Sequence, residues 1–112
     1  MKIAVPMTGG LLSQHFGHCE VFALYDVIPE RKEIERVRSV TPPAHAPGVL
    51  PGWLHSEGVD LVIVGGMGSR AQALLSSTGI RVVTGAPLER PDAIVRSYLD
   101  AALVTGDNAC DH

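Results

Sequence analysis

The amino-acid sequence predicts an α/β domain in which a mixed β-sheet carries helices on its faces. Three strand-like apolar segments fill the first half of the chain with no helical pattern between them. In the second half, short apolar runs alternate with segments whose apolar residues have helical spacing. The expected order is therefore β-β-β-α-β-α-β-α, with right-handed crossovers that place helices against the sheet. A chain of 112 residues with no internal repeat fits one compact domain, so residues 1–112 are expected to form a single domain.

The first half of the chain predicts a central strand followed by a hairpin. Lys2–Val5 is a short apolar run, and residues 7–20 resemble an irregular loop with one helical turn. Val21–Val27 is apolar on both faces, as expected of a buried strand. After a turn-like segment, apolar and charged residues alternate along Glu33–Val40. This pattern predicts the second strand of a hairpin, at an edge of the sheet.

The second half predicts three helices that alternate with two strands. Unbroken apolar runs favour buried parallel strands, and glycines after helical patterns favour helix ends. The expected elements are, in order, a Pro-rich loop at 41–48, a helix with Pro47 or Pro51 in its first turn and an end at Gly58, a strand at 60–65, a helix at 69–77, a strand at 80–84, a helix at 92–103 and a polar tail at 104–112.

The overall composition argues against binding to nucleic acids and membranes. The net charge is −3 and no run of Lys or Arg offers the basic face that binds phosphates. No stretch approaches the roughly 20 apolar residues that cross a bilayer. The N-terminus reads as a strand broken by Pro6 rather than as a signal peptide, so the expected location is the cytoplasm. In that compartment Cys19 and Cys110 are expected to be free thiols.

The segment Ser13–Cys19 is the first candidate for metal chemistry. His15 and Cys19 are four residues apart, so a helical turn would place imidazole and thiol on one face. These groups suit soft and borderline metals, and a thiolate also suits metal–sulfur clusters. The alternative is that Cys19 is a small buried hydrophobic residue and His15 only caps the loop. His18 is a weaker candidate that is expected to face solvent.

The glycine-rich turn after the strand at 60–65 is the second candidate. Gly66-Met67-Gly68 joins a buried strand to a helix, where unpaired amides and missing side chains favour an anion. The alternative is a tight turn that needs glycine whether or not anything binds. The turn is neither a Walker loop nor a complete dinucleotide fingerprint. Arg70 either adds positive charge to this site or is simply a solvated helix residue.

Three further positions carry potential metal ligands. His45 in the Pro-rich loop is of interest if that loop lies beside the Ser13–Cys19 segment. The pair Cys110 and His112 in the tail could fold onto a metal held elsewhere, or belong to a disordered end. His55 is expected near the carboxyl end of a helix, where the dipole favours it, rather than at a metal. No Cys-x-x-Cys occurs, so a structural zinc site is not indicated.

The residues do not indicate an enzyme. A Cys–His nucleophile needs an orienting group and an oxyanion hole, and Asp26 and Asp60 are the obvious acids on strands. Asp60 is more simply explained as a polar residue at the start of a strand. The first strand carries no Asp or Glu, so the sequence does not show the paired carboxylates of a two-metal hydrolase.

Sequence blocks from Lys2–Pro6 to Gly106–His112, taken together and in order, resemble the dinitrogenase iron–molybdenum cofactor biosynthesis accessory proteins. That family includes free-standing cofactor carriers, the carrier-like domain fused to the cofactor synthase, and relatives of unassigned role. The resemblance covers nearly the whole chain and rests on Lys2–Pro6, Ser13–Cys19 with Val21-Phe22, Trp53–Asp60, Gly65–Ala71, Gly79–Val82 and, in a subset of members, the ending Gly106–His112.

The resemblance implies a ribonuclease H-like fold with a mixed five-stranded sheet flanked by helices, which agrees with the order derived above. It also implies reversible binding of an anionic metal–sulfur cluster of the iron–sulfur, iron–molybdenum or molybdenum–copper type. The implied site lies in loops at one end of the sheet, with His15 as the first ligand, Cys19 and His45 next, amides of Gly66, Met67 and Gly68 toward the sulfides, and Cys110 and His112 closing over the cluster. Nitrogenase carriers often lack that terminal Cys-Asp-His, so its presence here favours a place among the relatives of unassigned role.

The function that follows is a small carrier or scaffold for cluster assembly or delivery, whose partners are cluster-donor and cluster-acceptor proteins. Few ligands and flexible loops suit reversible binding. A net charge of −3 opposes an anion, so a locally positive site is required. Two alternatives are a regulatory module beside a P-loop cluster-assembly ATPase and a mononuclear zinc or copper binder.

Overall fold

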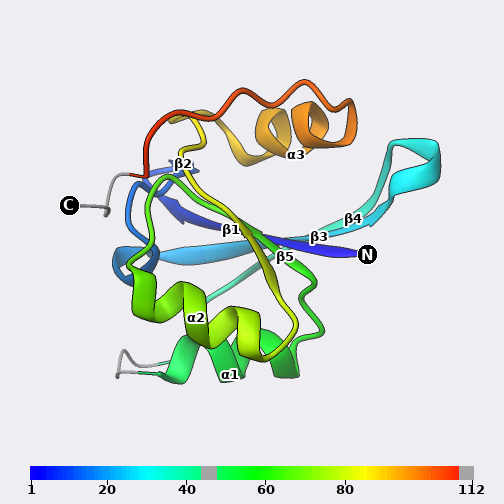
Figure 1. The fold of residues 1–112 in the computed structure, drawn as a ribbon. Helices are drawn as coiled ribbons and strands as arrows, with labels where there is room; N and C mark the ends of the chain where they lie inside the picture. Colours follow the sequence, from blue (N-terminus) through cyan, green and yellow to red (C-terminus); the bar gives the residue numbers. More distant parts are fainter. Residues whose placement is uncertain (44–47, 109–112) are drawn as a thin grey trace.

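A mixed β-sheet lies at the centre of the molecule with helices on both of its faces (Figure 1). The computed structural model describes residues 1–43 and 48–108. The sheet order is β4-β3-β1-β5-β6, and a short β2 pairs with β1. The strands are β1 (Lys2–Thr8), β2 (Leu11–Leu12), β3 (Val21–Ile28), β4 (Glu33–Val40), β5 (Leu61–Ile63) and β6 (Arg81–Val83).

Three α-helices, α1 (Val49–Ser56), α2 (Ser69–Ser77) and α3 (Pro91–Leu99), cover the sheet in the described part of the chain. Helices α1 and α2 lie on one face and α3 lies on the other (Figure 1). The face of α1 and α2 is built around Phe22, Leu54 and Leu75. The α3 face is built around Tyr25 and Ile94. The apolar spacing that predicts each helix therefore reflects its contact with the sheet.

The mixed topology, and the alternation of helices and strands in the second half of the chain, agree with the predicted fold. β1 pairs antiparallel with β3 and parallel with β5, which makes it the central strand. β3 and β4 form the predicted hairpin, joined by a 3-10 turn at Pro29–Arg31, and β4 lies at the sheet edge. Helix α2 spans the predicted residues 69–77, and Pro51 lies in the first turn of α1.

The expectation of a five-stranded sheet is wrong, because residues 1–43 and 48–108 already contribute six strands to it. β1 does not stop before Pro6 but continues to Thr8, and the chain then folds back as β2, pairing Met7 with Leu12. Pro6 is tolerated inside β1 because it lies beyond Ile3 and Ala4, the residues that pair with β5, so the donor it lacks is not needed for that pairing; its carbonyl accepts the N–H of Ser13. A two-residue strand leaves too short an alternation to recognise in the sequence.

The last helix is shorter than predicted. Helix α3 ends at Leu99 rather than at residue 103, because Ala101 adopts a left-handed conformation with φ of 57°. Leu103 still packs against the core on the α3 face. The chain beyond it runs back toward the carboxyl ends of the parallel strands (Figure 1). Across the described residues, each helix is too short or too polar to cross a membrane.

Candidate functional site

The carboxyl ends of four strands lie at one edge of the sheet. β1, β5 and β6 are mutually parallel. β4 runs in the same direction as β1, because both are antiparallel to β3. The loops that follow β1, β5 and β6 therefore meet at this edge, as ligand-binding loops do in other α/β sheets. The C-terminal segment reaches the same edge (Figure 1).

Backbone hydrogen bonds join these segments into one structure. The N–H of Gly65 donates to the carbonyl of Ser13 at 3.1 Å, and the N–H of Gly85 donates to Gly65 at 2.8 Å. The N–H of Gly106 then donates to Gly85 at 2.7 Å. We call Gly65, Gly85 and Gly106 the glycine ladder. It connects the loop after β2, the loop after β5, the loop after β6 and the C-terminal segment.

Two rungs of the glycine ladder require glycine for steric reasons. A Cβ atom on Gly65 would lie 2.8 Å from the Cα of Gln14. A Cβ atom on Gly85 would lie 2.0 Å from the carbonyl oxygen of Gly106, and Gly85 also has a φ of +76°. Backbone is packed against backbone at both positions, so the sequence can bring these loops together only by omitting side chains.

His15 lies on a loop that is anchored from two sides. Its backbone is extended, its N–H donates to Ser13 Oγ at 3.3 Å, and its carbonyl accepts from the same hydroxyl at 2.9 Å. The next residue, Phe16, is buried and donates its N–H to the carbonyl of Gly66 at 3.0 Å. The exposed His15 side chain thus comes from a segment bonded directly to the glycine-rich turn.

The predicted helical turn between His15 and Cys19 is wrong. The chain makes only a 3-10 turn at Phe16–His18, and both flanking residues are extended. Cys19 is half-buried and packs against the core on the α1 and α2 face. Burial raises the pKa of its thiol from 9.0 to about 11, an effect only partly offset by a backbone hydrogen bond. At neutral pH it is a protonated thiol, the state expected of a small buried hydrophobic residue.

The glycine-rich turn is held at Met67 by a residue from the C-terminal segment. The N–H of Met67 donates to Asn108 Oδ1 at 2.9 Å, and Asn108 Nδ2 donates to the Met67 carbonyl at 2.9 Å. The Met67 side chain is buried. Because Asn108 accepts the Met67 N–H, this amide is already paired, in contrast to the expectation that it faces a ligand. The sequence pattern assigns no role to Asn108, since the two residues are 41 positions apart.

The start of α2 carries the electrostatic features of an anion site. Gly68 is the N-cap and supplies no capping side chain, and the first turn contains no acidic residue. The first-turn amides have no partner inside the helix, and the dipole is positive at this end. Arg70 adds an exposed cation to this turn. The contrast is α3, whose first turn carries Asp92, which accepts a hydrogen bond from the Tyr25 hydroxyl.

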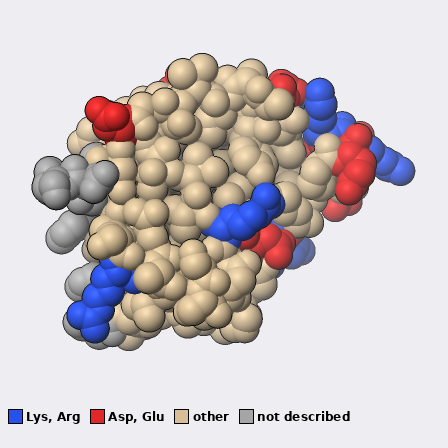
Figure 2. Space-filling view, in the orientation of Figure 1, with Lys and Arg blue, Asp and Glu red and all other residues tan. Residues whose placement is uncertain are grey.

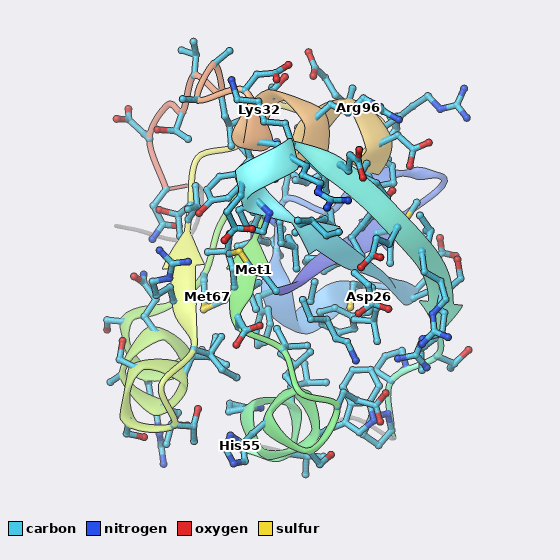
Figure 3. All side chains as sticks on the ribbon, turned by 90° about the vertical axis from the view of Figure 1, so that its right-hand side faces the viewer. Met1, Asp26, Lys32, His55, Met67 and Arg96 are labelled. Atoms are coloured by element: carbon cyan, nitrogen blue, oxygen red, sulfur yellow. The ribbon has the colours of Figure 1, made fainter. Side chains whose placement is uncertain are left out.

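The remaining candidate ligands differ in whether the structure describes them. His45, Cys110 and His112 lie outside the described residues. His55 is exposed in the last turn of α1, as predicted, and Figure 3 shows it on that helix, separate from Met67. Among residues 1–43 and 48–108, no three His, Cys, Asp or Glu side chains are grouped closely enough to hold a metal ion.

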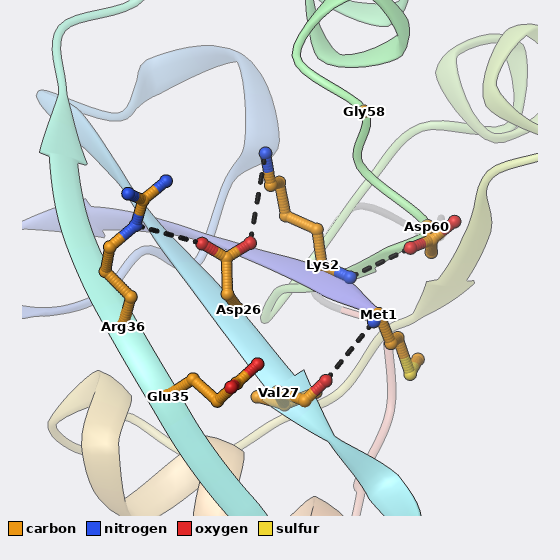
Figure 4. A pocket seen from close by; sticks show the side chains of 8 residues that line it. All are labelled: Met1, Lys2, Asp26, Val27, Glu35, Arg36, Gly58 and Asp60. Carbon is orange, nitrogen blue, oxygen red and sulfur yellow. Dashed lines mark hydrogen bonds and ion pairs between the residues drawn. The ribbon is translucent and has the colours of Figure 1, made fainter.

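The opposite end of the sheet holds a cavity of about 570 Å³ with a different character (Figure 4). Asp26 lies between Lys2, at 3.9 Å, and Arg36, at 3.2 Å. Lys2 Nζ also donates to the carbonyl of Glu57 at 2.8 Å, and the Asp60 carboxylate accepts the Lys2 backbone N–H at 2.8 Å. These charges neutralise one another, so this cavity is a weaker candidate for an anionic ligand.

Comparisons with known proteins agree with the resemblance seen in the sequence. Residues 1–101 match the family model described as dinitrogenase iron-molybdenum cofactor. An uncharacterized protein of Methanocaldococcus jannaschii is 31% identical over 108 residues, which cover 92% of this chain and 89% of the relative.

Solved structures show the same fold. The crystal structure of PH0822 superposes with a TM-score of 0.90 at 26% identity and covers 100% of both chains. The apo form of the orange protein of Desulfovibrio gigas superposes with a TM-score of 0.73 at 23% identity, covering 96% of this chain and 93% of that one. From the family match over most of its length, the chain belongs to the dinitrogenase iron-molybdenum cofactor family.

Proposed function

We propose that this protein is a carrier or scaffold that reversibly binds an anionic metal–sulfur cluster at the carboxyl end of its sheet. The observation that supports this most directly is the joining of the His15 loop to the glycine-rich turn. Phe16 donates to Gly66 and Gly65 donates to Ser13, so an exposed imidazole and the amides at the start of α2 lie on segments that are hydrogen-bonded to each other. The family to which the chain belongs is related to the iron–molybdenum cofactor.

The chemistry of these groups suits a cluster with exposed sulfides. The His15 imidazole would coordinate a metal ion of the cluster, and imidazole is a common ligand of iron and copper. The amides of Gly68 and of the first turn of α2 would donate to sulfides, and Arg70 would add a positive charge. These groups would offset the net charge of −3, which disfavours an anion.

The other proposed ligands have different standing. Cys19 is half-buried and its thiol has a raised pKa, so its use as a thiolate ligand would cost the free energy of deprotonating it. His45, Cys110 and His112 remain proposed ligands outside the described residues. A site with one exposed imidazole and several amides binds less tightly than one with several thiolates. Modest affinity is what a carrier requires in order to receive a cluster from a donor and release it to an acceptor.

Anaerobic reconstitution tests this proposal. The protein would be incubated with sulfide and either iron or molybdate, with and without copper, and then analysed for metal, sulfide and visible absorption. Trp53 is the chain's one tryptophan, so quenching of its fluorescence offers a second readout of uptake of a coloured cluster. We expect His15→Ala to weaken binding by about tenfold or more, consistent with loss of a metal ligand.

His55→Ala is the matched control, because it removes an exposed imidazole elsewhere in the molecule. Equal cluster content in wild type, His15→Ala and His55→Ala would contradict the proposed site. A colourless product with no metal in any variant would favour a regulatory module that works beside a cluster-assembly ATPase. Stoichiometric zinc or copper without inorganic sulfide would favour a mononuclear metal binder.

A further inference from the structure

We propose that Asn108 is a positioning residue of this site, which holds the glycine-rich turn in the conformation that receives the ligand. The part of this inference that concerns the cluster rests on the proposed function. The part that concerns the turn itself does not. Asn108 would not touch the reacting atoms, and it acts through the peptide groups of Met67.

The pairing between Asn108 and Met67 is specific to a carboxamide. The side-chain oxygen accepts the Met67 N–H at 2.9 Å while the side-chain nitrogen donates to the Met67 carbonyl at 2.9 Å. One donor and one acceptor on the same planar group are needed to pair with both backbone groups of one residue. An aspartate at this position would accept from the N–H but would repel the carbonyl oxygen. An alanine would leave both groups without this partner.

The position of Met67 explains why this pairing matters for a ligand. Met67 immediately precedes Gly68, the N-cap of α2, so its peptide groups set the direction in which the first amides of the helix point. Its carbonyl also accepts from Gln72 Nε2 at 2.9 Å, and its side chain is 1% exposed. A turn that glycines would otherwise leave flexible is held from three sides. A binding site that is already ordered loses less entropy when it binds.

The pairing also selects which amides remain for a ligand. Because Asn108 takes the N–H of Met67, an anion at this end would be bound by Gly68 and by the amides of the first helical turn. Asn108 itself is delivered by the glycine ladder, since Gly106 donates to Gly85 only two residues earlier in the chain. The C-terminal segment thus contacts the glycine-rich turn through described residues.

The test compares amide hydrogen exchange at Met67 with cluster release. In the protein without cluster, we expect Asn108→Ala to raise the exchange rate of the Met67 amide by about tenfold or more, because a protected amide loses its acceptor. With cluster bound, we expect about three- to tenfold faster release from Asn108→Ala, and a larger effect from Asn108→Asp, which adds repulsion. The melting temperature of Asn108→Ala should fall by no more than about 4 °C.

Matched variants separate positioning from general loosening. Gln72→Ala removes one of the three contacts to Met67 and should give a smaller change than Asn108→Ala. Thr105→Asp adds a charge to an exposed position of the same segment and should leave both readouts unchanged, whereas effects equal to those of Asn108→Asp would overturn the proposal. Unchanged Met67 exchange in Asn108→Ala would also overturn it, as would faster exchange with unaltered release.

The two proposals fail in different ways. If the wild type takes up no cluster, the carrier function fails, and the exchange measurement alone still decides whether Asn108 holds the turn. If the wild type binds cluster and Asn108→Ala binds and releases it identically, only the role of Asn108 fails.

Discussion

The two ends of the sheet are stabilised by different interactions. At the carboxyl end, four segments are joined through backbone groups of the glycine ladder, at 2.7 to 3.1 Å. At the amino end, Lys2, Asp26 and Arg36 form ion pairs at 3.2 and 3.9 Å around an open cavity (Figure 4). Figure 2 shows charged side chains of both signs gathered toward the β3–β4 hairpin, with fewer on the rest of that face.

This difference has a functional consequence. Charged side chains that pair with each other leave little net field, and exposed pairs contribute little to stability. Backbone amides at a helix start carry partial positive charge that does not depend on pH. The carboxyl end is therefore the better place for an anion, although its segments are also the less tolerant of substitution. The following experiments test that contrast.

Substitution at Gly85 is expected to have the largest effect. In Gly85→Ala the new Cβ atom would meet the Gly106 backbone, and alanine would also have to adopt a φ of +76°. We expect a loss of about 3 kcal/mol in the free energy of unfolding, measured by urea denaturation. The matched control is Gly10→Ala, where φ is +82° but no atom lies within 4 Å, so only about 1 kcal/mol should be lost. Equal losses would mean that the contact with Gly106 is unimportant.

Gly65→Ala is expected to have the next largest effect. Its Cβ atom would press on the backbone of Gln14 at 2.8 Å and separate the His15 loop from the glycine-rich turn. We expect a loss of about 2 kcal/mol together with weaker cluster binding. Gly52→Ala in α1, which has open space around its Cα atom, should instead stabilise the protein by about 0.5 kcal/mol. Unaltered stability of Gly65→Ala would show that the two loops can move apart easily.

The thiol of Cys19 predicts a pH dependence of stability. Its pKa is about 11 in the folded protein and 9.0 ordinarily, so between these values the unfolded chain binds fewer protons. Stability should therefore fall as pH rises through this range. Urea unfolding at about pH 8 and about pH 10.5 measures the fall, which should be smaller in Cys19→Ala. The comparison is needed because burial and the carboxylate of Asp92 also raise the pKa of Tyr25, which acts in the same direction at higher pH. An identical fall in both proteins would contradict the burial of Cys19.

The amino-end ion pairs should show the smallest effect. Asp26→Asn removes both pairs, but the partners are partly or mostly exposed. We expect a loss of about 0.5 kcal/mol in the free energy of unfolding, which should disappear in about 1 M salt. Glu30→Gln, at the exposed hairpin turn, serves as the control for loss of one negative charge. A loss as large as that of Gly65→Ala would remove the contrast between the two ends.

Much of the fold could be predicted because its signals are local. Alternation in Glu33–Val40 indicates an edge strand, and the glycine turn followed by helical spacing predicts α2 at residues 69–77. The candidate site could be predicted only in part. His15 and the glycine-rich turn share one end of the sheet, as the family resemblance implies. The helical turn that would have joined His15 to Cys19 did not form, because the buried Phe16 and its bond to Gly66 hold the loop in another conformation.

By itself, the sequence determined the mixed sheet, the order of its five longer strands and three helices, and the family, since periodicity and short motifs carry that information. Only the tertiary structure decided that Asn108 pairs with Met67, 41 residues away, and that Gly65, Gly85 and Gly106 bond in a row. Neither arrangement has a local signature, because an asparagine or a glycine in a loop looks the same in the sequence whichever residue it contacts in the folded protein. The chain must fold before such residues meet, and the packing of backbone against backbone then determines which residues are allowed there.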